Sequence, residues 1–416
     1  MTIELPRVET FTLACGLEVR VVTRAEATTS HVALLGSPGA VTRHPRVAIL
    51  RLLARVMSRA LEAEVSIGRS GFFVTRDVPG GDAVRFAIEA LAAAEHAGLT
   101  PRALFEVKAE LEHERVVLGR VMNESRARRL FGANSLEWSL AERSREVPEP
   151  SVDSLRETLR EQLAPARTRL VIVGPEATAA VRDALEAALA DAPVASNEVP
   201  PHLASESPRV LAPSPQLHAF ETVPSSTRVR MTAIGPSSFD ADAPAFELVF
   251  ALLTDARASR LRRTLDVARG FDDFSRLRPA VGHSVATVEF PVNPSDLAPS
   301  IEISMSELDR LTHADRIDPN ELAIARHAAM TRERTRFDEG SALARAVHEA
   351  AASDLELEAY AARFEAMRRV TAEDVAAVVQ RHLAPERVAF DVANDVETLS
   401  HLPTLPGGQR ISRRLP

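Results

Sequence analysis

The sequence contains very little cysteine, lysine, tyrosine or tryptophan, and the shortages of cysteine and lysine limit the kinds of site that the chain can form. Of the 416 residues, one is a cysteine (Cys15), one a tyrosine and one a tryptophan. A disulfide within the chain and a four-cysteine zinc site are therefore excluded. Lys108 is the only lysine, so arginine supplies nearly all of the positive charge. This bias is typical of a GC-rich genome, and runs of arginine are for that reason weak support for phosphate binding.

Long apolar runs and an excess of positive charge are also missing. No run approaches the ~18 apolar residues of a membrane-spanning helix, and the opening "MTIELPRVETFTLACG" lacks the basic and apolar regions of a secretory signal. The net charge of −8 gives no global attraction to nucleic acid. With 45% hydrophobic and 26% charged residues, the composition is globular. We therefore expect a soluble, cytoplasmic protein with a large core.

The clearest break in the chain is residues 191–216, "DAPVASNEVPPHLASESPRVLAPSPQ". This stretch is rich in proline and serine and has neither helical nor strand periodicity, as is typical of a linker. We expect an N-terminal domain over 1–195, a linker over 196–216 and a C-terminal domain over 217–416.

The two halves have the same order of predicted elements. The first has strand patterns from "TFTLA" to "SHVALLGS", a helix over 46–61, the strand pair "EVSIGR" and "GFFVTRDV", helices over 82–97 and 101–121, and a closing strand "RTRLVIVG" with a helix. The second has "HAFETV" and "TRVRMTAIG", a helix over 244–265, "HSVATVEFPV", four helical patterns over 296–383 and the strand "RVAFDVAN". The pattern predicts an α+β fold of two tandem repeats, each an antiparallel sheet covered by helices.

Several segments, taken in order, resemble the pitrilysin/insulinase-type metallopeptidases, the inverzincins. "LACGLEVRVV" resembles the family's opening "L-x-N-G-L-x-V" turn, with Cys15 in place of the asparagine. "RTRLVIVGPEATAAVRDALEAAL" resembles the strand and helix that end a repeat, and "FELVFALLTDARASRLRRTLDVARG" resembles the "S-R-L" helix of the second repeat. The family includes the mitochondrial processing peptidase and the core proteins of respiratory complex III. The resemblance implies half of a clamshell that pairs with another such chain around a peptide chamber.

Active members of this family bind zinc through H-x-x-E-H on the first helix, where the glutamate is the general base. Residues four apart lie on one helix face, so two imidazoles there hold one ion. No H-x-x-E-H occurs in this sequence. Aligned on "VAILRLLARVM", the histidine positions are Ile49 and Leu53 and the glutamate position is Leu52. With Val56 and Ala60 they predict an apolar stripe, opposite an arginine stripe at Arg51, Arg55 and Arg59.

The resemblance also locates a substrate-holding Arg/Tyr pair just after "S-R-L" in one chain of the heterodimeric relatives. Aligned from Ser259, those two positions are Asp266 and Asp273. Arg269 and Phe274 are nearby substitutes for substrate contact. We therefore expect neither a catalytic centre nor the family's substrate pair, and no metal or cofactor.

Two further clusters each allow two interpretations. Glu106, Glu110, His113 and Glu114 lie on one predicted helix, and Glu110–His113 has the spacing of a carboxylate-bridged metal site. A solvated charged face is the alternative, and we favour it because no matching ligands are identified on other helices. The arginines of residues 256–269 either bind a peptide C-terminus or acidic segment, or form an exposed helix face, which we favour.

Three functions remain open. The preferred one is a non-catalytic subunit that forms half of a peptide chamber with a homologous zinc-bearing peptidase subunit. A homodimer is the other assembly that the sequence allows. The alternative is a structural, assembly or binding protein on the same scaffold, as with the respiratory core proteins. The third is an unconventional activity at the Glu110–His113 face.

We predict that the isolated chain does not cleave unstructured peptides, with or without added zinc, because no residue at the ligand positions has a donor atom. A fluorogenic peptide assay with the purified chain measures this. Zinc-dependent turnover that disappears on chelation would contradict the prediction.

Overall fold

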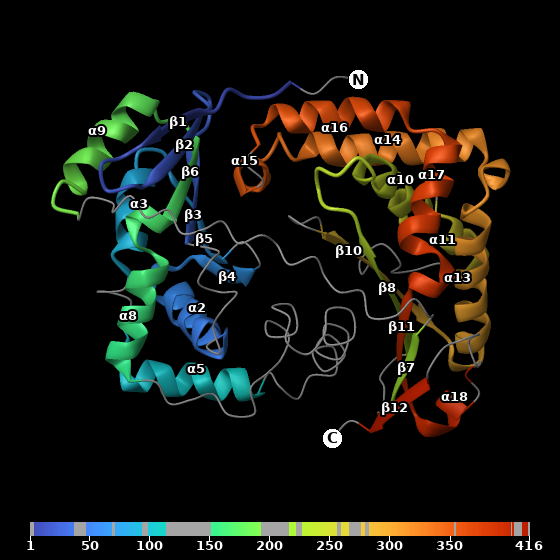
Figure 1. Ribbon diagram of the computed structural model, residues 1–416. Helices are drawn as coiled ribbons and strands as arrows, with labels where there is room; N and C mark the ends of the chain where they lie inside the picture. The colour runs from blue at the N-terminus through green and yellow to red at the C-terminus, as the bar shows by residue number, and fades with distance from the viewer. Residues whose placement is uncertain are drawn as a thin grey trace. The chain divides into compact units, whose positions relative to one another are not determined.

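The computed structural model describes residues 4–36, 47–68, 71–93, 99–113, 151–192, 216–221, 227–255, 259–265, 276–278, 283–352, 355–400, 402 and 410–414. These residues form two compact units (Figure 1). The first comprises the described residues up to 192 together with Thr335–Glu358, and the second comprises the remainder. The linker expected over 196–216 lies outside the described residues except for its last position.

The first unit is built on a six-stranded sheet in the order β1-β2-β6-β3-β5-β4. Its strands are β1 (Glu9–Thr12), β2 (Glu18–Thr23), β3 (Thr29–Gly36), β4 (Glu64–Gly68), β5 (Gly71–Pro79) and β6 (Thr168–Gly174). Its described helices are α2 (Val47–Leu61), α3 (Ala83–Leu91), α5 (Pro101–His113), α8 (Val152–Gln162), α9 (Thr178–Ala188) and α15 (Gly340–Ala352).

Local sequence explains where these elements begin and turn. Gly16 has a φ of 85° in the turn between β1 and β2, a conformation that glycine adopts without steric cost. Pro101 occupies the first turn of α5, where its missing N–H has no helical partner. The Ser151 hydroxyl caps α8 by accepting a hydrogen bond of 3.1 Å from the backbone N–H of Ser154. The helix starts expected at 46, 82 and 101 lie within one residue of the observed starts of α2, α3 and α5.

One face of the first sheet forms the main apolar core. Alternate strand residues such as Val19, Val32, Leu34 and Ile172 pack with α2, α3 and α9 in a single cluster of buried side chains. The opposite face contacts α15 through β3 and β6. The sheet is therefore covered on both faces, which suits its nearly continuous apolar strands β3 and β6.

The second unit repeats this arrangement. Its sheet has the order β12-β7-β11-β8-β10-β9. The strands are β7 (Gln216–Glu221), β8 (Thr227–Gly235), β9 (Arg276–Arg278), β10 (Ser284–Val292), β11 (Ala389–Asn394) and β12 (Arg410–Arg414). The described helices are α10 (Ala243–Thr254), α11 (Arg260–Leu265), α13 (Leu297–Leu311), α14 (Pro319–Thr335), α16 (Glu358–Arg369), α17 (Ala372–Val378), which continues into a π-helical turn at Val379–Leu383, and α18 (Val396–Ser400).

Five strands of each sheet correspond in order and direction, so that β2, β6, β3, β5 and β4 match β7, β11, β8, β10 and β9. In each unit, the strand of the five that comes last in the sequence lies between two earlier strands. β6 pairs parallel with β2 and antiparallel with β3, and β11 pairs parallel with β7 and antiparallel with β8. The α+β fold and its repetition are confirmed. The sheets are mixed rather than purely antiparallel, because the helical segments between the first and last strands allow a parallel crossover.

Some elements differ from expectation. The edge strands β9 and β12 were not predicted. The helix expected over 244–265 is two helices, α10 and α11. Five helices, rather than four, occupy 296–383 before the π-helical turn. Residues 335–358, expected within the C-terminal half, belong to the first unit, since α15 packs on β3 and β6.

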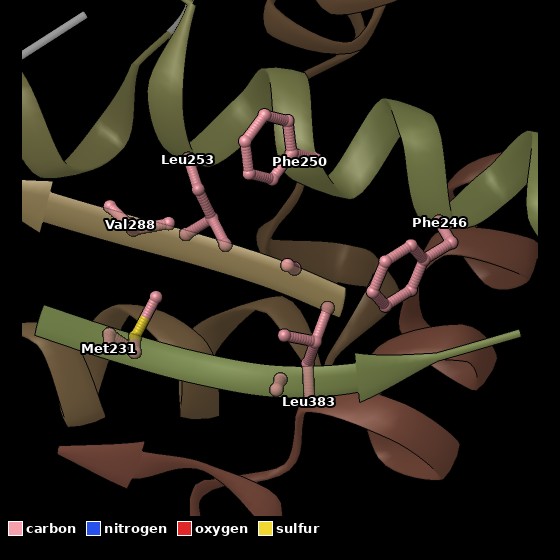
Figure 2. Close-up of a pocket in the computed structure, with 8 residues that line it drawn as sticks. Met231, Phe246, Phe250, Leu253, Val288 and Leu383 are labelled. Atoms are coloured by element: carbon pink, nitrogen blue, oxygen red, sulfur yellow. The ribbon is translucent and has the colours of Figure 1, made fainter. Parts of the chain in front are cut away.

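A small apolar pocket lies beneath α10 in the second unit. Figure 2 shows Phe246, Phe250 and Leu253 of α10 facing Met231 of β8 and Val288 of β10, with Leu383 beside them. Ala233 and Ala286 complete the lining. No lining side chain is polar, so this pocket offers no group for catalysis or metal binding. Among the described helices, none has both the length and the apolar character needed to cross a membrane.

We predict that Leu53→Ala lowers the free energy of unfolding by about 2–5 kcal/mol, because Leu53 is 0% exposed in the core and its loss leaves a cavity. Chemical denaturation followed by circular dichroism measures the change. Ala60→Ser, on the exposed side of the same helix, is the control and should shift stability by less than about 0.5 kcal/mol. Equal stability of the Leu53→Ala variant and wild type would contradict the packing described here.

Candidate functional site

The candidate site is the face of α2 on which the resemblance places the metal ligands. Leu52 is 2% exposed and Leu53 is 0% exposed, and both belong to the apolar core with Leu50, Val56 and Met57. Ile49 lies in the first turn of α2, and its side chain is outside the described residues. The described part of this face thus presents methyl groups packed against neighbouring side chains. It has neither a donor atom for a cation nor a carboxylate for activating water.

The opposite side of α2 carries the expected positive charge. Arg55 and Arg59 are exposed, and Arg59 forms ion pairs with Glu110 and, at 3.9 Å, with Glu106 of α5. Ala60, expected in the apolar stripe, is exposed instead, and Met57 and Leu61 form the buried side of this last turn.

The α5 cluster consists of solvated ion pairs as far as the structure describes it. Glu106 and Glu110 are exposed, and Arg102 pairs with Glu106 at 3.0 Å. Glu110, which supplies the carboxylate of the Glu-x-x-His spacing, forms an ion pair with Arg59. The side chain of His113 and all of Glu114 lie outside the described residues. Over the described ranges, no three histidine, cysteine, aspartate or glutamate side chains gather as a metal site would require.

The family's substrate-pair positions are not located by the structure. Asp266, Asp273 and the substitutes Arg269 and Phe274 all lie outside the described residues. Their roles remain predictions from the sequence.

The comparisons with known proteins concern the family and the fold. Residues 151–329 match the family model of the peptidase M16 inactive domain. The central part of the chain is therefore similar to the inactive domain of M16 peptidases. Its match begins at α8 and ends within α14, so it spans parts of both units. A search of curated proteins found no match.

Solved structures extend the similarity to nearly the whole chain. A protease from Helicobacter pylori has a TM-score of 0.75 at 13% identity, covering 94% of this chain and 100% of its own. A putative M16-like peptidase from Alicyclobacillus acidocaldarius has a TM-score of 0.72 at 18% identity, covering 95% and 100%. A peptidase M16 inactive domain from Pseudomonas fluorescens has a TM-score of 0.72 at 16% identity, covering 96% and 100%. At these identities the similarity establishes the M16 fold and no more.

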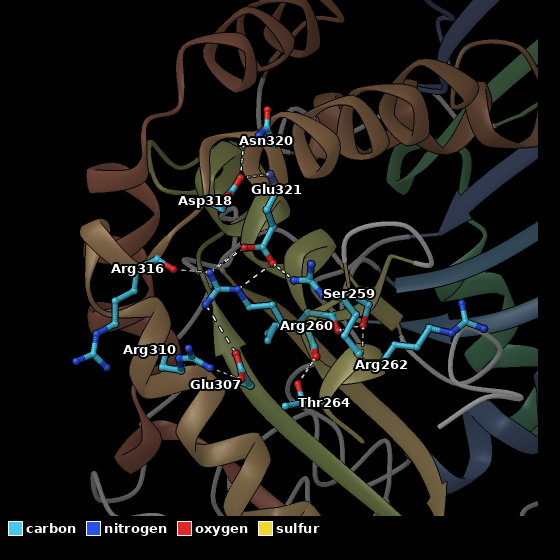
Figure 3. A network of polar contacts seen from close by, with 12 residues as sticks. Ser259, Arg260, Arg262, Thr264, Glu307, Arg310, Arg316, Asp318, Asn320 and Glu321 are labelled. Carbon is cyan, nitrogen blue, oxygen red and sulfur yellow. Dashed lines mark hydrogen bonds and ion pairs between the residues drawn. The ribbon is translucent and has the colours of Figure 1, made fainter. Parts of the chain in front are cut away.

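The M16 fold carries a buried polar network where the sequence pattern favoured an exposed helix. Arg260 of the "S-R-L" motif is 7% exposed. Its guanidinium donates hydrogen bonds of 3.0 and 2.9 Å to the two carboxylate oxygens of Glu321 and lies 3.8 Å from Glu307 (Figure 3). It also donates to the backbone carbonyl of Arg316 at 2.8 Å. The exposed-face interpretation was wrong for Arg260, because its partners come from α13 and α14, more than forty residues away.

The same network fixes the start of α11. The Ser259 hydroxyl donates to the carbonyl of Leu253 at 2.7 Å and accepts from the backbone N–H of Arg262 at 3.0 Å. Ser259 is therefore the N-terminal cap of α11 and also ties it to the end of α10. The "S-R" pair of the motif thus has a structural role, with serine starting the helix and arginine neutralising two buried carboxylates.

A second buried ion network lies on α10, the helix that occupies in the second sheet the place of α2 in the first. Glu247 is 6% exposed and accepts a hydrogen bond of 2.6 Å from Arg363 of α16, with Arg332 of α14 at 3.7 Å. Arg363 also lies 3.6 Å from Glu333. Glu247 is thus committed to an ion pair, and sequence analysis did not find this network. No local pattern marks it, since its members are up to 116 residues apart.

Charged residues also lie on the second face of the first sheet, where β2 and β6 pair. Glu18 accepts hydrogen bonds from Arg20 at 2.7 Å and from Arg169 at 2.9 and 3.0 Å. Burial raises the pKa of Glu18, but the hydrogen bonds and charges of Arg169 and Arg20 outweigh it, so the pKa lies below its usual value. This carboxylate is therefore ionised at neutral pH, and its two guanidinium partners make it a weak base.

We predict that Arg260→Met lowers the free energy of unfolding by about 3–5 kcal/mol, because the buried carboxylates of Glu321 and Glu307 lose their buried partner and then depend on the exposed guanidinium groups of Arg263 and Arg310. Arg316→Met is the matched control. Its side chain is exposed and points away from the network in Figure 3, while its carbonyl stays in place. Urea denaturation of both variants measures the difference, and equal losses in the two variants would exclude the assigned role of Arg260.

Proposed function

We propose that this chain is a catalytically inactive, cytoplasmic subunit of a heterodimeric zinc metallopeptidase. It forms half of a peptide-binding chamber, and a homologous subunit with H-x-x-E-H supplies the zinc and the reaction. The observation that carries this proposal is α2. The helix covers one face of the sheet, and Leu52 and Leu53, to which the sequence resemblance assigns the family's glutamate and histidine positions, are buried in the core.

The retained two-unit scaffold supports this proposal. A chain that had lost peptidase function without any replacement role would be free to lose its two-unit organisation as well. Instead both sheets keep the same five-strand order, and the M16 fold spans nearly the whole chain. A subunit that supplies chamber wall needs this architecture and none of the metal ligands.

A second candidate is an assembly or binding protein with no peptidase role. A chain of complex III2 from Candida albicans has a TM-score of 0.73 at 15% identity, covering 94% of this chain and 97% of its own. That likeness shows that the same scaffold occurs in a respiratory complex. It favours this candidate only if the chain has no zinc-bearing partner.

We predict that co-expression with an H-x-x-E-H homologue encoded nearby yields a one-to-one complex in native mass spectrometry. Obligate interfaces bury on the order of 2,000–5,000 Å², so the complex should survive dilution to nanomolar concentration. Cleavage of an unstructured fluorogenic peptide should require both chains, and it should disappear when a zinc-ligand histidine of the homologue is replaced by alanine.

The possible outcomes separate the candidates. A homologue that is equally active alone would contradict the subunit proposal. A chain that forms no complex with the homologue and instead co-purifies with a non-peptidase assembly would favour the second candidate.

A further inference from the structure

The segment Thr335–Glu358 passes from the second unit into the first and returns. Its helix α15 packs on β3 and β6, on the face of the first sheet opposite α2. Leu343 and Ala344 are 0% exposed and Val347 is 1% exposed, so one side of α15 is fully buried. This segment covers a sheet whose own strands lie more than 150 residues earlier in the chain.

Polar contacts hold both ends of the segment to the sheet. At the start, Arg24 donates hydrogen bonds to the backbone carbonyls of Phe337 and, at 2.7 Å, of Asp338. At the end, Glu356 lies 3.5 Å from Arg20 of β2. Between them, Arg345 lies 3.7 Å from Glu64 of β4. Each of these sites includes an exposed or half-exposed charged group, namely Arg24, Glu356 or Arg345, although Arg20 itself is buried. Contacts of this kind are weak enough to allow α15 to open locally.

His348 lies in the middle of the docked helix. It is 6% exposed, and its ring centroid is 5.8 Å from that of Phe73 on β5. Within the described residues, neither ring nitrogen has a hydrogen-bond partner. A buried imidazole without partners is tolerated as a neutral ring packed on an aromatic neighbour, but a charged imidazolium there would have two unsatisfied donors.

The groups around His348 are more positive than negative. Arg20 and Glu18 face it from β2 and Arg169 faces it from β6. Glu18 is already hydrogen-bonded to both arginines, and Glu349, next to His348 on α15, pairs with Arg336 at 3.3 Å. The His31–Asp77 pair lies at the other end of α15, where Gly340 approaches His31. No carboxylate among these is left to stabilise an imidazolium at position 348.

We propose that His348 makes the docking of α15 on the first sheet dependent on pH: the neutral imidazole packs against Phe73, and its protonation weakens the docking. Thr335–Glu358 is then a covering segment whose local opening is promoted by acid, while the rest of the first unit stays folded.

The direction of the pH dependence follows from the pKa of His348. Burial, together with the charges of Arg169 and Arg20 and against that of Glu18, lowers the pKa of His348 from 6.5 to about 3 in the docked state. In the open state the ring is solvated and regains the ordinary value. Docking therefore has its full strength above pH 6.5 and weakens steadily as the pH falls toward 3. Between pH 7.5 and pH 5 the opening equilibrium of α15 should rise about 30-fold.

Hydrogen exchange of the full chain, resolved by peptide and corrected for the intrinsic pH dependence of exchange, tests this. The amides of α15 should lose about 30-fold of their protection between pH 7.5 and pH 5. Those of α9, on the opposite face of the same sheet, should keep theirs. His348→Phe retains a flat ring against Phe73 and cannot titrate, so its α15 protection should be equal at both pH values. The control His327→Asn, an exposed histidine on α14, should behave as wild type.

Three results would overturn the proposal: unchanged α15 protection at pH 5 in wild type, an equal loss in His348→Phe, or loss of protection by α9 and α15 together. If His348→Phe does not fold, histidine ring-carbon NMR of the wild-type chain decides. The His348 resonance should not titrate above pH 5, and a midpoint near the ordinary histidine value would exclude it as the sensor.

Discussion

The first unit depends on the burial of the α2 stripe against the first sheet. An amphipathic helix at this place has to cover Phe72, Val74 and their neighbours on β5 and β4, because a sheet face left open would expose a large apolar surface. Each fully buried leucine contributes about 1.5–3 kcal/mol, whereas an isolated carboxylate or imidazolium at the same depth costs free energy unless a metal or a counter-charge neutralises it. Aliphatic residues at Leu52 and Leu53 therefore suit the scaffold better than metal ligands would. A lineage with no selection for zinc chemistry would gain stability from such a replacement.

The two units show different uses of the same helix position. In the first, α2 is aliphatic on its described inner face. In the second, every residue of α10 is buried, and its one carboxylate, Glu247, is neutralised by Arg363. The opposite faces of the sheets are alike in charge: Glu18 joins Arg20 and Arg169 on the first, and Glu289 joins Arg228 and Arg230 on the second. Each sheet thus has an apolar face for its own helices and a face crossed by arginine–glutamate pairs. This organisation separates packing from polar contacts.

Much of this fold was predictable because its signals are local. Strand alternation located β2, β8 and β10, and apolar runs located β3 and β6. The pattern over 46–61 gave α2 within one residue. The edge strands β9 and β12 were missed because three to five residues with little burial carry no periodic signal. The parallel pairing of β6 with β2 and the docking of α15 on the first sheet are long-range choices, and local propensity does not encode them.

The candidate site divides along the same line. The sequence alone shows that α2 has no metal ligands at the expected positions. The burial of Leu52 and Leu53 in the core then explains why the helix is retained. Buried arginines were harder to predict, because composition alone gives no reason to distinguish one arginine from another. Arg59 matched that expectation as an exposed residue, whereas Arg260 and Arg363 did not. Each of these two buried arginines has a carboxylate partner far away in the sequence, 61 residues for Arg260 and 116 for Arg363, and the hydrogen bond between them is buried. A planar guanidinium with donors on two edges satisfies such a carboxylate better than an ammonium would. In a chain with a single lysine, arginine therefore serves both as surface charge and as the main means of holding glutamates inside the second unit.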